Sequence, residues 1–294
     1  MFGSLLWRIQ EAKNVLLGKK KTIPTKPTRS SWHPSHIKDP KINKDLLNYL
    51  NSISIEFCFS EFGEQRVNAG GSSFSGNRLE PSFSSLKRFF PHAKFTVYSD
   101  FDLIIPGVEL IKINHIPVPE PEHPRYLYRV ADYYKFYSLL HSTADFKCVI
   151  DSDMFAVSEE IYCLVYLTET FGACAPYNTR NLLKKDMQIS LDTKEINDKS
   201  NGYGHSYNQS PMTLWKDFEK GKAFYEACCQ WMIKDPSRAS RVMWLAAQET
   251  GFSPYLLPQQ FCVCDGDEGI GDEVLLHVGH PNVAQYYNIK NDHR

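Results

Sequence analysis

Apolar positions through the middle of the chain alternate between short runs with strand periodicity and longer runs with helical periodicity. Residues 52–59 (Ser-Ile-Ser-Ile-Glu-Phe-Cys-Phe) combine alternation with β-branched residues and predict a first strand. The same reading predicts strands at 94–98, 108–113, 146–150 and 171–176, and helices at 81–90 and 125–140. Strands that alternate with helices indicate an α/β fold, with a mostly parallel central sheet flanked by helices.

The carboxyl-terminal part continues this pattern with longer polar interruptions. Residues 178–205 are rich in Asn, Lys and Asp and predict a surface insertion or a flap. After it we expect strands at 207–215, 255–263 and 274–278, with a helix at 218–233 between the first two. A second polar loop, rich in glycine, follows the first strand over residues 60–80.

The first 45 residues differ from the rest. Residues 2–17 carry a partly helical apolar stripe, and a Lys-Lys-Lys run at 19–21 and a Pro/Thr-rich stretch follow. Two interpretations stay open. The segment is either an arm packed on its own domain or on a partner subunit, or a basic helix lying on an anionic membrane surface through residues 1–21. We therefore divide the chain into an arm, 1–45, and a main domain, 46–294; an oligomer stays open.

Charge and cysteine usage narrow the class of protein. The formal net charge is −1, whereas binding a nucleic-acid backbone needs a basic field, so we expect no nucleic-acid partner. No window approaches the ~18 consecutive apolar residues of a membrane span, and residues 1–17 do not read as a secretory signal. The eight cysteines lie mostly in apolar segments without paired C-x-x-C spacing. They indicate reduced core thiols in a cytoplasmic protein, with peripheral membrane contact if the arm is a surface helix.

The strongest chemical signal is a pair of carboxylates after the 146–150 strand. Asp151 and Asp153 are separated by one residue and follow an apolar run. In open α/β sheets ligands bind beyond the carboxyl ends of the strands, and Mg²⁺ or Mn²⁺ prefers carboxylate and phosphate oxygens. A bare Asp-x-Asp is also a common turn cap. Its position after a buried-looking strand favours a metal site, with a nucleotide diphosphate completing the shell.

The preceding helix adds charged side chains that share one face. Arg129, Asp132 and Lys135 are spaced three apart. This pattern fits a solvated ladder of ion pairs. It equally fits a face turned into the cleft, where Lys135 would meet the diphosphate while Arg129 and Asp132 bind sugar hydroxyls or support the metal site.

A histidine near the carboxyl terminus is the candidate third ligand. His277 ends the predicted strand at 274–278, and His280 follows it closely as the rival. Imidazole is an acceptable ligand for Mn²⁺ beside two carboxylates. A strand-end histidine is also common as a purely structural residue.

As an ordered set, these motifs resemble the GT-A glycosyltransferases, and most of all the glycogenin and lipopolysaccharide galactosyltransferase family. A secondary likeness is to the capsular and initiation mannosyltransferases. The likeness covers residues 50–285. It rests on the charged helix, Asp151-Ser-Asp153, Tyr207-Asn208-Gln209-Ser210, Gln248-Glu249, Leu257-Pro258 and His277-Val-Gly279. The chain departs from the pattern at Lys135 (usually Arg), Pro211 (usually Gly) and Ala247 (usually Asp), and it lacks the Lys-Pro-Trp that commonly follows the histidine.

The resemblance implies a metal-dependent glycosyltransferase of the GT-A nucleotide-diphospho-sugar fold. Such an enzyme moves a sugar from a nucleotide-diphosphate sugar, UDP favoured and GDP open, to a glycan, a lipid-linked acceptor or another hydroxyl. Mn²⁺ or Mg²⁺ would be held by Asp151, Asp153 and His277. The likeness leans towards retention of configuration, with Gln248 or Asn208 near the anomeric carbon and Asp132 in the same catalytic group. For inversion, a base such as Glu249 or Asp217 would be needed instead.

The nucleotide base is expected between the first and second strands. Phe59, Tyr98 and Asp100 are the candidate contacts there, although a strand-end Asp100 also suits a turn cap. The donor-binding set is completed by Arg129, Lys135, Asp151 and Ser152.

Three other classes compete with this reading. A nucleotidyltransferase or sugar-nucleotide synthase would share the fold, but it usually carries a basic Gly-rich loop, and the segment 70–76 contains no lysine. A degenerate carbohydrate-binding protein would have no need of the intact carboxylate pair. A metal phosphohydrolase would need more carboxylate and histidine clusters than the sequence holds.

Overall fold

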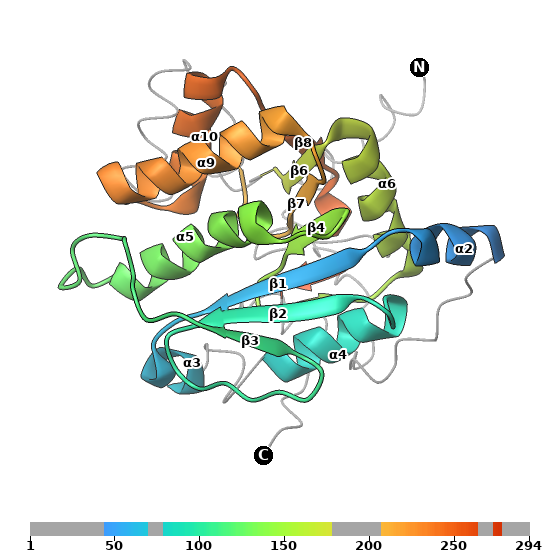
Figure 1. The fold of residues 1–294 in the computed structure, drawn as a ribbon, viewed down its shortest axis with the longest axis horizontal. Coiled ribbons are helices and arrows are strands. Elements are labelled where there is room, and N and C mark those ends of the chain that lie inside the picture. The colour runs from blue at the N-terminus through green and yellow to red at the C-terminus, as the bar shows by residue number, and fades with distance from the viewer. Residues whose placement is uncertain (1–43, 70–78, 178–206, 264–272, 278–294) are drawn as a thin grey trace, which may run out of the picture.

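The computed structural model of the 294-residue chain describes residues 44–69, 79–177, 207–263 and 273–277 (Figure 1). The predictions for residues 1–43 of the arm, for the whole polar loop at 178–205 and for His280 lie outside these residues, as does part of the glycine-rich loop. The first described helix, α2 (Lys44–Ser52), leads into the sheet. Within the described part of the chain, no helix combines the length and the apolar character needed to cross a membrane.

The centre of the fold is a seven-stranded sheet in the order β3-β2-β1-β4-β7-β6-β8. Only β7 runs antiparallel to its neighbours in this sheet. This confirms the predicted α/β class with a mostly parallel sheet. The strands are β1 (Ile55–Glu61), β2 (Lys94–Ser99), β3 (Glu109–Lys112), β4 (Phe146–Val149), β6 (Ala173–Pro176), β7 (Met212–Trp215) and β8 (Tyr255–Leu257).

Helices cover both faces of the sheet and create two hydrophobic cores. Figure 1 shows α5 over one face, with α9 and α10 stacked beyond it, and α4 on the other side. Side-chain alternation along β1 divides the cores, since Phe57 and Phe59 belong to one and Cys58 to the other. The helices are α3 (Glu64–Ala69), α4 (Leu79–Phe89), α5 (Tyr126–His141), α6 (Tyr162–Phe171), α9 (Glu219–Lys234) and α10 (Ala239–Thr250).

A separate two-stranded sheet, which the sequence pattern did not foresee, carries the end of the described chain. In it β5 (Met154–Ala156) pairs antiparallel with β9 (Leu275–His277). The strand expected at 274–278 is confirmed in part, but it belongs to this small sheet and not to the central one. Three residues are too few to show a period of two, which is why β5 leaves no recognisable signal.

Two further differences come from local sequence. The strand expected at 255–263 ends at Leu257, and a 3₁₀ turn (Gln259–Phe261) follows Pro258, which cannot donate to a ladder. Helices α2, α3, α6 and α10 were not predicted, and α3 lies within the expected loop at 60–80. Helix α6 is rich in aromatic and β-branched residues, which are weak helix formers. The seven cysteines among the described residues are all free, and every one except Cys163 is buried, as expected for core thiols.

Candidate metal centre and its surroundings

The Asp-x-Asp segment forms a tight turn between β4 and β5. The amide of Met154 donates to the carbonyl oxygen of Asp151 at 3.0 Å, which closes the turn. The last ladder contact before it is the amide of Ile150 on the carbonyl of Cys58 in β1. The turn therefore lies beyond the carboxyl end of β4, where ligands bind in open α/β sheets. The segment is both a turn and the carrier of two half-buried carboxylates.

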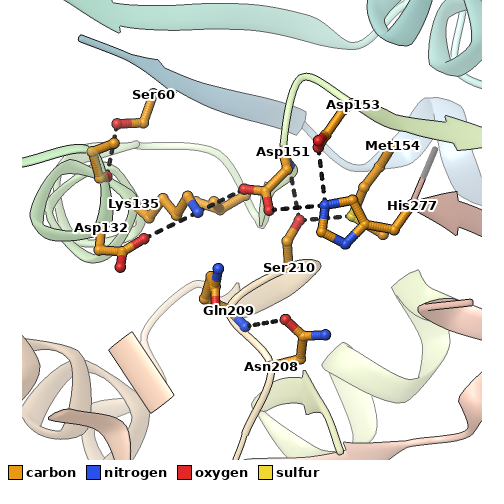
Figure 2. A network of polar contacts seen from close by, with 12 residues as sticks. Ser60, Asp132, Lys135, Asp151, Asp153, Met154, Asn208, Gln209, Ser210 and His277 are labelled. Atoms are coloured by element: carbon orange, nitrogen blue, oxygen red, sulfur yellow. Dashed lines mark hydrogen bonds and ion pairs between the residues drawn. The ribbon is translucent and has the colours of Figure 1, made fainter. Parts of the chain in front are cut away.

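Strand register brings His277 to these carboxylates. In the β5–β9 pair, His277 lies opposite Met154, directly after the turn. The His277 Nε2 atom is 3.1 Å from Oδ1 of Asp153 and 3.8 Å from Oδ2 of Asp151 (Figure 2). One ligand atom from each of the three residues lies within 4.8 Å of the others. The structure thus joins the three residues that the sequence analysis proposed as metal ligands.

The donor set fits a divalent cation. Two carboxylates and an imidazole supply oxygen and nitrogen ligands from three separate side chains, a combination that suits Mn²⁺ and, with more water, Mg²⁺. Each ligand comes from a backbone that is held in place, two from the closed turn and one from a strand. Such support matters because a metal site needs its ligands in position before the ion arrives.

Lys135 is the cation that belongs to this site. Its Nζ atom lies 2.6 Å from Oδ1 of Asp151 and 3.2 Å from Oδ1 of Asp132, and the residue is 7 % exposed. Burial alone lowers the pKa of Lys135, but the charges of Asp151 and Asp132 outweigh it and raise that pKa above the ordinary value. Lys135 is therefore a buried ammonium group between two carboxylates, with Asp151 reaching towards Lys135 by one oxygen and towards His277 by the other.

The charged face of α5 divides between two environments. Asp132 and Lys135 lie at the candidate site, as the cleft-facing interpretation expected. Arg129 pairs instead with Glu120 in the loop before the helix. The simple solvated ladder of ion pairs does not describe this face, because Lys135 is buried.

Asn208 and Gln209 directly precede Ser210, whose hydroxyl contacts the amide of Asp151, on the segment that leads into β7. Asn208 is held by three contacts: its amide donates to Pro176, its side-chain nitrogen to Cys262 Sγ, and its side-chain oxygen accepts from the Gln209 amide. Figure 2 shows the half-buried Gln209 side chain directed towards the Lys135–Asp151 pair. The sequence motif Tyr207-Asn208-Gln209-Ser210 contains Gln209, but it predicted no role for this residue. The polar side chain of Gln209, next to Asn208, was the only local indication of such a role.

The alternative glutamine, Gln248, lies at the other end of the molecule. It is exposed on the last turn of α10. The ring of Phe252, just after that turn, packs on Phe218. Trp215, the last residue of β7, pairs with Phe146, the first residue of β4. Phe218 comes three residues after Trp215 and therefore lies at the amino end of β4. Gln248 therefore sits towards the amino end of β4, while the carboxylates sit beyond its carboxyl end, so the structure does not bring Gln248 to the candidate metal centre.

The two residues offered as bases for inversion share that remote end. Glu249 accepts a hydrogen bond from the Trp231 indole, and Asp217 pairs with Lys222 at the start of α9. Neither carboxylate is near the candidate metal centre, so neither Glu249 nor Asp217 is placed to act as the base of an inverting mechanism.

The residues proposed for the nucleotide base have other surroundings. Phe59 and Tyr98 are buried in the two cores, at 1 % and 4 % exposure, so neither ring offers a face on which a base could stack. Asp100 accepts a hydrogen bond from the amide of Gly63 at 2.8 Å, a contact between segments 37 residues apart and not a cap of its own turn. Ser152 is half-buried in the middle of the Asp-x-Asp turn.

Three comparisons with known proteins were made, by family model, by sequence and by structure. No family model matches the chain, and no curated protein matches its sequence. Among solved structures it is similar to the galactosyltransferase LgtC with donor and acceptor sugar analogues (10 % identity, 76 % of this chain and 86 % of that one, TM-score 0.47). It is also similar to mouse xyloside xylosyltransferase 1 (11 % identity, 81 % and 94 %, TM-score 0.46).

A third similar structure is a nucleotidyltransferase, the 2-C-methyl-D-erythritol 4-phosphate cytidylyltransferase of Thermus thermophilus (12 % identity, 80 % and 98 %, TM-score 0.42). Two of these three proteins are glycosyltransferases. At such identities and TM-scores below 0.5 the similarities carry no argument about the activity of this chain, which has to rest on the geometry of its own site.

Proposed function

We propose that the protein is a glycosyltransferase that moves a sugar from a nucleotide-diphosphate sugar, a UDP-sugar in the first place, to a hydroxyl acceptor with the help of Mn²⁺ or Mg²⁺. The observation that carries this proposal is the convergence of Asp151, Asp153 and His277 within 4.8 Å beyond the carboxyl end of a central strand. A divalent ion at that position has open coordination for the oxygens of a diphosphate.

Asp151, Asp153 and His277 would hold the ion, which supplies positive charge for the departing nucleotide diphosphate. The protein adds a second cation of its own. Lys135 keeps the carboxylate of Asp151 oriented through its 2.6 Å contact, and its ammonium group contributes to the positive potential that an anionic leaving group meets. Asp132 holds Lys135 in this place from the opposite side.

Retention of anomeric configuration is the stereochemistry we favour. Among the described residues of Figure 2, the carboxylates are Asp151 and Asp153, assigned to the metal, and Asp132, paired with Lys135. The neighbouring side chains, Asn208 and Gln209, are neutral amides and cannot act as general bases. A retaining transfer needs no strong protein base, since the departing phosphate can accept the proton of the acceptor hydroxyl.

We assign Gln209 to the place near the sugar, because Gln248 lies away from the candidate metal centre. Its side chain is directed towards the carboxylates and Lys135, and its amide offers both a donor and an acceptor to sugar hydroxyls or the ring oxygen. Asn208 is already committed to Pro176, Cys262 and Gln209, which suits a residue that shapes the pocket.

A glycan or lipid-linked acceptor, a cytoplasmic location and surface contact with a membrane through residues 1–21 remain expectations from the sequence. Deletion of residues 1–30 would abolish binding to anionic liposomes if the membrane interpretation is right, and would leave it unchanged if the arm packs on protein.

Thermal unfolding with a panel of nucleotides and sugar nucleotides, each with and without Mn²⁺, tests the proposal directly. A ligand that binds only the folded chain raises the unfolding midpoint. We expect UDP or a UDP-sugar to do so only when metal is present. The nucleotidyltransferase alternative predicts a shift with a nucleoside triphosphate and metal instead, and the absence of any metal-dependent shift would contradict both.

A further inference from the structure

A buried hydroxyl group fastens the turn that carries the two carboxylates. Ser210 is completely buried, and its Oγ atom accepts a hydrogen bond from the backbone amide of Asp151 at 2.8 Å. The same hydroxyl donates to Sδ of Met154 at 2.9 Å, at the other end of the turn (Figure 2). A hydroxyl has one proton to donate, so donation to Met154 leaves a lone pair for the Asp151 amide.

This contact stands where the backbone ladder stops. In the β4–β7 pair, Val149 and Met212 are the last paired residues. One residue further along, Ile150 still donates to Cys58 of β1. The amide of Asp151 comes next, and its hydrogen bond goes to a side chain instead of a strand. The Ser210 hydroxyl therefore adds one hydrogen bond beyond the end of the β4–β7 pairing. It makes this bond at Asp151, whose carboxylate is a proposed metal ligand.

Two more buried serines hold the other side of the same segment. Ser82 of α4 donates to the carbonyl of Met154 at 2.6 Å, and Ser85 of α4 accepts from the amide of Ala156 at 3.0 Å. Strand β5 is thus attached to α4 on one side and to β9 on the other. With these contacts in place, Ser210 links the start of the turn to the segment that enters β7 and to Met154 of β5.

We propose that Ser210 is a positioning residue for the metal centre, acting through the backbone of Asp151 and touching neither metal nor substrate. The inference rests on the proposed function, because it concerns the ion that Asp151, Asp153 and His277 would hold. Without the hydroxyl, the part-buried amide of Asp151 loses this partner, and the turn can relax away from the geometry that brings both carboxylates to His277.

A titration of the full chain with Mn²⁺ tests this role and requires no turnover. The electron paramagnetic resonance signal of free Mn²⁺ measures how much of the ion is bound. Changes to groups that orient metal ligands weaken metal binding by about 10–100-fold, and we expect Ser210→Ala to fall in that range. Thr168→Val is the matched control. It also removes a fully buried hydroxyl, but one bonded to Leu164 and Thr213, so its Mn²⁺ affinity should equal that of the wild type.

Hydrogen exchange of the Asp151 amide in the metal-free wild-type chain adds a readout that does not depend on the variant folding. We expect this amide to be protected, and to exchange faster in Ser210→Ala. An unprotected amide, or a folded Ser210→Ala that binds Mn²⁺ as tightly as the wild type, overturns the positioning role and leaves the proposed function intact. A wild-type chain that takes up no Mn²⁺ overturns the metal centre, and this inference with it.

Discussion

The imidazole of His277 lies 3.1 Å from the carboxylate of Asp153, although His277 ends strand β9 and Asp153 lies in the turn before β5, far away in the chain. The contact follows from the pairing of β5 with β9, which sets His277 opposite Met154. A shift of this register by one residue would turn the imidazole to the other face of the small sheet, because side chains alternate along a strand. The geometry of the candidate metal centre therefore depends on one pairing of two short strands.

Asp153→Asn should remove most of the metal affinity while keeping the size of the side chain. A neutral amide is a poorer ligand for a hard divalent ion than a carboxylate, so we expect Mn²⁺ binding to weaken by more than about 100-fold. The measurement is Mn²⁺ titration together with the metal-dependent midpoint shift produced by UDP. Asp217→Asn, at an exposed carboxylate near the start of α9, serves as the control and should behave like the wild type. Equal binding by both variants would rule out Asp153 as a ligand.

Lys135→Met should destabilise the fold, because it leaves Asp132 and Asp151 facing each other without a cation. Breaking a buried ion pair by removing one partner costs about 3–5 kcal/mol, and we expect a loss of this size in urea unfolding without metal. Adding Asp132→Asn to the variant should recover part of the loss, since one unpaired charge disappears. Lys222→Met, which removes a lysine from an ion pair on the surface, should have a much smaller effect. A Lys135→Met chain as stable as the wild type would contradict the buried pair.

Gln209→Ala and Gln248→Ala should separate the two glutamines cleanly. We expect Gln209→Ala to lower turnover by about 100-fold, the scale for losing one polar contact to charge that develops during a reaction. Gln248→Ala should leave turnover unchanged, because Gln248 is exposed at the far end of α10. The measurement is steady-state transfer, or donor hydrolysis, with the donor found by thermal unfolding. The reverse order of effects would restore Gln248 to the site and refute the placement of α10.

Alkaline pH should destabilise the fold through its buried thiols, and Cys174 offers a defined case. Burial raises the pKa of the Cys174 thiol from 9.0 to about 11. Since this pKa is higher in the folded state than in the unfolded state, the stabilisation is complete below pH 9 and is lost as the pH rises towards 11. Each such group contributes a slope of about 1.4 kcal/mol per pH unit in that window. Urea unfolding at pH 8 and at pH 10 should show a smaller loss for Cys174→Ala than for the wild type, and equal losses would contradict the shift.

The sequence by itself determined the elements whose signal is local. The alternating runs at 94–98 and 146–150, the long helix at 125–140 and the position of Asp151 and Asp153 after an apolar strand all match the structure within one or two residues. These features depend on side-chain periodicity and on the chemistry of neighbouring residues, which a single chain displays directly. The class of fold followed from the same alternation of strands and helices.

Only the tertiary structure decided which of the chemically plausible residues meet. His277 reaches the carboxylates through the register of two three-residue strands, too short to show a period. Gln248 lies on the last turn of α10, away from the carboxylates. Gln209 and Ser210 lie close to them, because the segment that leads into β7 passes the Asp151 turn. Lys135 pairs with Asp151 across two elements, and Phe59 and Tyr98 are taken up by the cores. The reason is physical: spacing along a chain constrains contacts within one helix or strand, whereas contacts between elements are set by packing and strand pairing across the whole domain.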